Sequence, residues 1–267
     1  MKKKYPFWKP FFALFLLGLV GVLSLLFTTL PQLDQFGVLP PELAALPLPL
    51  VAFYVLLQPT ILLLIATAIG CLLAPRIGLV SFVYEKAAYG SPVLGRLKPQ
   101  IILALVLGLV FAVVVTLLDM AFMPFMGVEF TAIEGQEFNL YAQLGMGMLY
   151  GGITEELMLR WGIMSLLAWL GWILLGRSAS GPHRGVVWAA IIISSILFGI
   201  GHLPAMAMLV PLTTIIVIRT VLLNAIGGIV FGWLFWRRSL EAAMIAHAAT
   251  HVGFFIIRLL VLATGLA

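Results

Sequence analysis

Six ionisable residues in the second half of the chain have the types and the spacing that hydrolytic chemistry needs. They are Glu155, Glu156, Arg160, His202, His247 and His251. All lie in mostly apolar stretches, where charged groups are costly and usually functional. A carboxylate in a poorly solvated site becomes a better base, and imidazole can orient a water molecule, share its proton or bind an oxyanion. The set therefore indicates activation of water.

Spacing along a helix distinguishes the two carboxylates. Glu156 and Arg160 are i,i+4 neighbours, so they share one helix face and can neutralise each other. Glu155 projects about 100° away from Glu156 and is left less compensated. His247 and His251 are also i,i+4 and stack on one face of another helix.

The same groups also suit a divalent metal. Neutral imidazoles and a carboxylate are zinc ligands, and two histidines at i,i+4 are a known ligand spacing. The candidate ligands are Glu155, His202, His247 and His251. A polar network that only holds helices together is the remaining structural interpretation.

Composition identifies the environment of these residues. Of 267 residues, 63% are hydrophobic and 9% are charged, whereas a soluble domain has about 45–50% apolar and about 25% charged residues. So few charges exclude an ordinary cytosolic enzyme, a disordered chain and a nucleic-acid-binding domain. The single cysteine, Cys71, allows no disulfide within the chain.

Seven apolar stretches are long enough to cross a bilayer. They cover residues 11–30, 50–73, 100–122, 139–175, 186–202, 212–236 and 242–262. The fourth would be about 54 Å long as one helix, so it could form two spans. With a single span there, every loop Lys and Arg lies on the side of the N-terminus, and the opposite loops hold only Asp34, Glu42, Glu129, Glu134 and Glu137. The positive-inside rule then favours seven spans with a cytoplasmic N-terminus in the plasma membrane.

Other charged residues have structural explanations. Glu241, beside Arg237 and Arg238, is expected at the membrane interface. Asp119 and Arg258 fall in the outer thirds of their spans, where they pair with each other or reach the headgroups. Arg219 lies mid-span and needs an acidic or carbonyl partner, which favours a structural ion pair.

Two pairs of glycines have the spacing of close helix contacts. Gly147 with Gly151, and Gly228 with Gly232, let helix backbones approach each other in lipid.

The histidine motifs lie at different distances from the ends of their spans. His247 lies about 13 Å beyond Arg238, whereas His202 lies about 27 Å beyond Arg184. For these histidines to meet, the fifth span must tilt or begin in the cytoplasm, or the seventh must begin deeper.

The polar residues form three ordered motifs: Glu155-Glu156-x-x-x-Arg160 followed by Trp161-Gly162, then Phe198-x-x-x-His202, then His247-x-x-x-His251. Over roughly residues 140–255 the set resembles the CPBP (Abi) family of intramembrane proteases, which includes type II CAAX prenyl endopeptidases and bacteriocin-processing enzymes. The resemblance implies an all-α, polytopic helical membrane protein with about seven transmembrane helices. Residues 1–138 would form the first three helices with their loops, and residues 139–267 the catalytic core.

The resemblance also implies roles. Glu155 would be the general base that activates water, with His202 helping to hold it. Glu156 and Arg160 would shape and neutralise the site, and His247 and residue 251 would stabilise the oxyanion. Family members often carry Asn or Asp at the last position. His251 departs from that pattern and adds a third imidazole, so a metal-free glutamate-type enzyme and a metalloprotease both stay open.

We therefore expect an intramembrane endopeptidase that cuts peptide or lipidated protein substrates at the lipid bilayer, either prenylated CAAX-type or bacteriocin-like. No nucleic-acid partner is expected. A membrane transporter and a non-catalytic immunity or scaffold protein are the alternatives. If the protein is a protease, then Glu155, His202, His247 and His251 should line one cavity.

Overall fold

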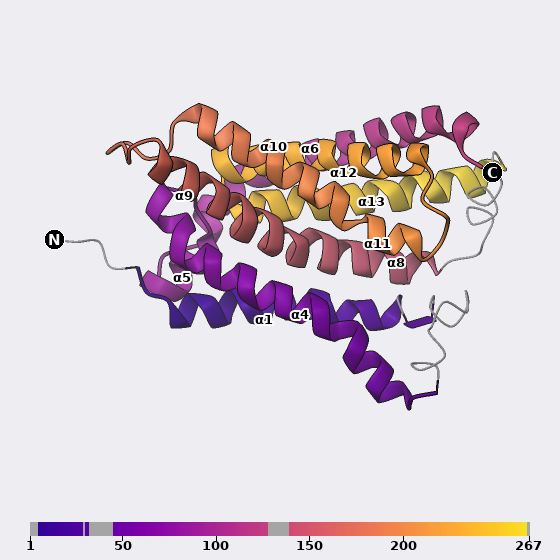
Figure 1. Ribbon diagram of the computed structural model, residues 1–267, viewed down its shortest axis with the longest axis horizontal. Coiled ribbons are helices and arrows are strands. Elements are labelled where there is room, and N and C mark those ends of the chain that lie inside the picture. The colour runs from indigo at the N-terminus through magenta and orange to yellow at the C-terminus, as the bar shows by residue number, and fades with distance from the viewer. Residues whose placement is uncertain (1–4, 29, 32–44, 128–138, 266–267) are drawn as a thin grey trace.

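The protein is helical throughout the residues that the structure describes. A computed structural model places residues 5–28, 30–31, 45–127 and 139–265, and none of these forms a strand. Seven helical segments are long and apolar enough to cross a membrane. Figure 1 shows them side by side, with the start of α1 and the end of α13 at opposite ends of the bundle. The prediction of an all-α membrane protein with seven spans is confirmed.

Among the described residues, fourteen helical segments form the seven spans, and one more, α5, lies outside them. The first three spans are α1 (Trp8–Ser24) with η1 (Leu25–Phe27), α4 (Leu48–Leu73) with η2 (Ala74–Ile77), and α6 (Leu94–Phe122) with η3 (Met123–Phe125); the short α5 (Phe82–Tyr89) precedes α6. The fourth consists of α8 (Leu140–Met146), η4 (Gly147–Glu155), η5 (Leu157–Met164) and α9 (Ser165–Leu174). The last three are α10 (Arg184–Gly201) with α11 (Leu203–Ala207), α12 (Thr214–Arg237) and α13 (Leu240–Thr264).

The fourth span is one unbroken helix, as charge distribution predicted. It runs over Leu140–Leu174 without a turn. Its middle is π-helical in η4 and η5, on either side of Glu156. A π-helix bonds residue i to residue i+5, is rare, and is found mostly at functional sites. Hydropathy predicted this span but not its wider winding.

The helices pack in pairs around the fourth span. α6 lies along α13, α10 lies along α12, and α1 and α4 cover the π-helical segments. Gly228 of α12 lies against α10, because a Cβ added to it would be 2.6 Å from Cβ of Ser195. A Cβ on Gly232 would be 3.1 Å from Ile191. The predicted close helix contact at this glycine pair is therefore confirmed.

The start of the seventh span is covered by residues 80–83. The backbone N–H of Leu240 donates to the carbonyl oxygen of Val80 at 2.9 Å. Glu241 is buried, and its Oε1 accepts hydrogen bonds from Ser81 Oγ at 2.7 Å and from the backbone N–H of Val83 at 3.0 Å. Glu241 is therefore held by hydrogen bonds within the protein, which its position beside Arg237 and Arg238 did not predict. The contact with residues 80–83 fixes the first turn of α13 against another part of the chain.

An ion pair joins two of the apolar helices. Nη2 of Arg219 in α12 donates to Oδ2 of Asp119 in α6 at 2.7 Å. The partner that Arg219 needs is therefore Asp119, and the expected pairing of Asp119 with Arg258 is wrong. Arg258 is exposed on α13. A charged pair at this depth is compensated only when both partners are present.

Cations gather at one end of the bundle, on the left in Figure 1, where α9 ends and α10 begins. The described ones are Lys9, Arg76, Lys86, Arg96, Lys98, Arg177, Arg184, Arg237 and Arg238. Lys2, Lys3 and Lys4 and the five acidic residues of the predicted outer loops lie outside the described residues. The distribution agrees with the charge argument for a single fourth span.

Candidate active site

The three motifs meet around the carboxylate of Glu155, the last residue of η4. Its Oε1 lies 3.9 Å from Nε2 of His202, the residue that ends α10. Its Oε2 lies 3.8 Å from Nε2 of His247 in α13. One carboxylate therefore faces two imidazole rings that come from two other helices.

The second nitrogen of each ring shows where its proton lies. Nδ1 of His202 is 2.9 Å from the carbonyl oxygen of Phe198. A carbonyl oxygen only accepts, so this Nδ1 must donate. Nδ1 of His247 is 2.9 Å from Oε1 of Glu156 and donates to it as well. Nε2 of each neutral ring is then an acceptor, so the space beside Glu155 suits a donor such as water.

Glu156 and Arg160 form a buried pair next to this site. Oε2 of Glu156 and Nε of Arg160 are 3.3 Å apart, and neither side chain is more than 1% exposed. The Arg160 guanidinium lies 4.8 Å from the ring centroid of Phe198 and 5.6 Å from that of Phe231, both within range of cation–π attraction. The predicted i,i+4 pairing is confirmed. Glu156 is thus balanced by Arg160 and orients His247, whereas Glu155 has no cation of its own beside it among the described contacts.

His247 is held by ring contacts as well as by Glu156. Its ring is stacked on that of Phe231, with centroids 4.5 Å apart and an angle of 16° between the planes. On α13 the ring of His251 is stacked on His247 at 5.3 Å and 19°. The side chain of His247 is almost fully buried. Its orientation toward Glu155 is therefore set from several sides.

His251 occupies a space that two glycines leave open. A Cβ added to Gly151 would lie 2.7 Å from Nε2 of His251, and one added to Gly147 would contact Nδ1. The glycine pair predicted to bring helix backbones together therefore makes room for an imidazole. Within the described part of the chain, no hydrogen bond or ion pair connects His251 to Glu155. Its contact with the site is through His247.

A cavity of about 570 Å³ reaches Glu155 between α4, the fourth span and α10–α11. Helix α4 contains Pro59, and Figure 1 shows that the first half of this helix bends away from the rest of the bundle. The walls are apolar apart from four polar side chains: Gln58, Tyr150, Glu155 and His202. Leu62, Ile65 and Leu197 line the cavity and are also exposed. The cavity is therefore lined in part by exposed apolar side chains.

The motif residues converge, but not all of them line this cavity. Glu155 and His202 do. His247 lies beside Glu155, and His251 lies beside His247. Arg160 and Glu156 are buried away from the cavity wall, as expected for the neutralising pair.

A metal ion is the alternative that the number of histidines suggested. Among the residues that the structure describes, no group of three or more His, Cys, Asp or Glu side chains is placed so that it could hold a metal ion. His251, which supplied the third imidazole of that prediction, stacks on His247 instead of facing Glu155. The donors do not fit a preformed metal site, and no step proposed below uses one.

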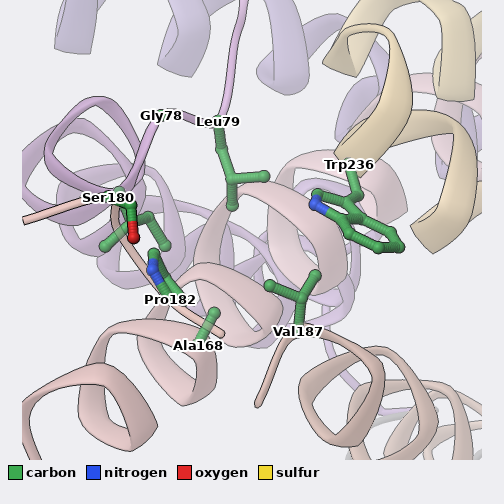
Figure 2. Close-up of a pocket in the computed structure, with 8 residues that line it drawn as sticks. Gly78, Leu79, Ala168, Ser180, Pro182, Val187 and Trp236 are labelled. Atoms are coloured by element: carbon green, nitrogen blue, oxygen red, sulfur yellow. The ribbon is translucent and has the colours of Figure 1, made fainter. Parts of the chain in front are cut away.

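A second, smaller cavity of about 160 Å³ lies at the basic end of the bundle. Figure 2 shows that Leu79, Ser180 and Trp236 approach it from three different segments. None of the residues that line it is ionisable, and none also lines the larger cavity. Acid–base chemistry therefore belongs to the larger cavity.

The comparison with known families agrees with the motifs. Residues 137–253 match the family model described as Type II CAAX prenyl endopeptidase Rce1-like. This segment, less than half of the chain, is similar to that family. It contains all six motif residues, from Glu155 to His251. Neither a curated protein nor a solved structure matches the chain.

The match confirms the resemblance drawn from the sequence. The family is one of proteases, which supports a protease in this integral membrane protein. The Rce1-like segment contributes α8 to α12 and the first half of α13. Helix α4 lies outside the segment, yet it forms one wall of the cavity.

Two polar residues of that cavity were not singled out by sequence. Gln58 interrupts the second apolar span, and its polarity at that depth was the available indication. Tyr150 precedes Glu155 by five residues, which in an α-helix would point the two side chains about 140° apart. Because η4 bonds residue i to residue i+5, both side chains face the cavity. Periodicity gave no indication of this.

Proposed function

We propose that the protein is an intramembrane endopeptidase in which Glu155 activates the water that cleaves a peptide bond. The observation that supports this most directly is the position of Glu155. Its carboxylate lies within 4 Å of Nε2 of both His202 and His247, at the wall of an apolar cavity. A sheltered carboxylate beside two proton acceptors is suited to general-base catalysis.

The reaction proposed here needs only water and the peptide. The water gives one proton to Glu155 while its oxygen attacks the carbonyl carbon, and the electrons of the C=O π bond move to the carbonyl oxygen. An Nε2 atom of His202 or His247 accepts a hydrogen bond from the second O–H. Glu155 then passes its proton to the amide nitrogen, the C–N bond breaks with its electron pair going to nitrogen, and a carboxylic acid and an amine leave. Glu155 is regenerated in its charged form.

The other motif residues act through these three. Arg160 balances the charge of Glu156, and Glu156 holds the Nδ1–H of His247, so that Nε2 of His247 faces Glu155. His251 packs against the ring of His247 and occupies the space over Gly151. These residues position the site and keep a buried arginine compensated.

The cavity is suited to a peptide attached to the membrane. Its apolar walls would accept a lipid-bearing chain, and we propose that such a chain enters from the bilayer between the helices. Burial of an apolar chain in such a cavity contributes about 25 cal/mol per Å². Prenylated CAAX-type proteins and bacteriocin-like peptides are the proposed substrates, consistent with the family description.

We also propose a plasma-membrane protein with a cytoplasmic N-terminus. The nine described cations at one end of the bundle would then face the cytoplasm. The cavity is lined by Leu25 near the end of the first span and by residues from Leu197 to Met208, which lie toward the other end. The active site would therefore be reached from the outer half of the bilayer.

The transporter and the non-catalytic scaffold are less consistent with this geometry. A carrier needs polar groups along a path, whereas here the charged residues of the motifs form one cluster. The test is cleavage of an internally quenched, prenylated CAAX-type peptide by purified protein in detergent. We expect Glu155→Gln to lower the rate by about 10²-fold or more while the fold is retained. Glu85→Gln, a carboxylate paired with Arg96 outside the site, is the control.

Two results would end the protease proposal. An active Glu155→Gln protein would show that Glu155 is not the base. A wild-type protein that cleaves neither prenylated nor unmodified peptides, although folded, would favour the non-catalytic alternatives.

A further inference from the structure

The motif residues leave a peptide substrate without hydrogen-bond donors. Glu155 is an acceptor, and the tautomers of His202 and His247 make their Nε2 atoms acceptors too. A peptide in the cavity brings carbonyl oxygens that lose water on binding. If an amide group of the peptide has no hydrogen-bond partner in an apolar environment, the affinity for the peptide falls by several-fold to more than a thousandfold. Donors are therefore needed from elsewhere in the cavity.

The described cavity wall contains two more polar side chains, and both can donate. Gln58 has a carboxamide with two N–H donors and one acceptor, and Tyr150 has a phenolic O–H. The remaining lining residues have apolar side chains or none. Gln58 and Tyr150 come from different helices, so they approach a ligand from two sides.

The placement of Gln58 is costly unless it has a ligand. It lies about 15 Å along α4 from Leu48, within a span of 30 residues, and its side chain is exposed beside the buried Pro59. The described contacts of the protein give its carboxamide no hydrogen-bond partner. Polar side chains within a membrane usually face a partner or a water-filled cavity. Here the cavity is what Gln58 faces.

Tyr150 is placed by the π-helix. It lies five residues before Glu155 in η4, which is one turn of i to i+5 bonding. Both residues line the cavity. A hydroxyl one turn from the base is suited to the carbonyl group that the activated water attacks, because a donor to the developing oxyanion must sit beside the nucleophile.

We propose that Tyr150 and Gln58 bind the backbone of the substrate peptide. Tyr150 donates to the carbonyl oxygen of the bond that is cut, and Gln58 hydrogen-bonds a neighbouring peptide group with its carboxamide. This rests on the proposed protease function and assigns its substrate-binding donors. It also explains why α4, outside the Rce1-like segment, contributes a polar residue to the site.

The experiment compares two substitutions with two matched controls, using the quenched prenylated peptide. Tyr150→Phe removes only the hydroxyl, and we expect kcat to fall about 10- to 100-fold with KM nearly unchanged. Gln58→Leu should raise KM about 5- to 50-fold, because the lost hydrogen bonds are made in the ground state. Tyr141→Phe, an exposed tyrosine in contact with Phe255, and Thr60→Val on α4 are the controls and should match wild type.

A substrate with an ester in place of the neighbouring amide separates binding from structural damage. The ester lacks the N–H from which the Gln58 carbonyl oxygen would accept a hydrogen bond. The rise in KM caused by Gln58→Leu should therefore be at least threefold smaller for the ester than for the amide. A Gln58 or Tyr150 variant whose kinetics match those of its control would overturn the assignment of that residue.

Peptide binding to Glu155→Gln protein, followed by fluorescence anisotropy, distinguishes failure of this inference from failure of the protease proposal. Binding that depends on Gln58, without any cleavage by wild type, would reject the protease and support the binding site. Cleavage by wild type that neither substitution changes would reject the binding site and leave the protease.

Discussion

The carboxylate of Glu156 accepts a 2.9 Å hydrogen bond from Nδ1 of His247, a residue 91 positions away in the chain. The same carboxylate is ion-paired with Arg160 at 3.3 Å. One buried glutamate therefore does two things: it compensates an arginine that has no access to water, and it fixes which nitrogen of His247 faces Glu155. The two adjacent glutamates of the first motif therefore have different surroundings, because only Glu156 has these partners.

Removing the charge of Glu156 should destabilise the protein. Glu156→Gln leaves Arg160 charged and buried without its counter-ion, which typically costs about 3–5 kcal/mol. Unfolding of purified protein in detergent by a denaturing surfactant measures this. The double variant Glu156→Gln with Arg160→Gln should cost less than the sum of the two single changes, because it removes both charges. If the loss of stability in the double variant equals the sum of the two single losses within about 0.5 kcal/mol, then Glu156 and Arg160 are not coupled.

The Glu156–Arg160 pair is also where reasoning from sequence worked best. An i,i+4 separation keeps two residues near each other in an α-helix, and they remain close in the wider turns of the π-helix, so the pairing did not depend on the winding. The relation of Tyr150 to Glu155 did depend on it. Five residues separate the two, and only the π-helix places them on one side. Local spacing could not show this, because nothing in the apolar pattern of the span distinguishes the two windings.

Gly151 tests how tightly the histidines are packed. An added Cβ would lie 2.7 Å from Nε2 of His251 and 3.3 Å from Nε2 of His247. We expect Gly151→Ala to displace both rings, to cost about 1–3 kcal/mol of stability, and to lower cleavage about tenfold or more. Gly145→Ala is the control, since a Cβ there meets nothing within 4 Å. Alanine at position 145 should be neutral or stabilise the helix by up to about 1 kcal/mol. Equal behaviour of the two variants would contradict the packing described for His251.

Partners between helices were harder to predict than the helices themselves. From their depth, Asp119 and Arg258 were expected to pair with each other or to reach the headgroups. Asp119 pairs with Arg219 instead, because the neighbours of a helix and its rotation decide which charges meet. Glu241 was placed at the interface because it follows two arginines. It is buried because residues 80–83 fold over the start of α13. Both contacts join distant segments of the chain, on which hydropathy and loop charge carry no information.

The proposed orientation can be tested by cysteine labelling in intact cells. In a Cys71→Ala background, Ala179→Cys lies in the exposed loop at the basic end, and Leu212→Cys lies in the exposed loop before α12 at the other end. A membrane-impermeant maleimide should label the cysteine at position 212 and reach the one at position 179 only after the cells are opened. The reverse pattern would place the N-terminus outside, against the positive-inside distribution.

The last prediction concerns the histidine at position 251. In the proposed metal-free enzyme, His251 packs against His247 without touching Glu155. His251→Asn restores the residue that the family resemblance suggests is common there, so cleavage should stay within about tenfold of wild type, and a chelator should have no effect. If zinc were bound by Glu155 and the three histidines, the same change would delete a ligand, and the amide oxygen would replace it poorly. Cleavage and metal content are measured on the same preparations, with Ala248→Gly on the same helix as a control for local loosening. Stoichiometric zinc in the wild type that is lost in His251→Asn, together with activity, would establish a metalloprotease instead.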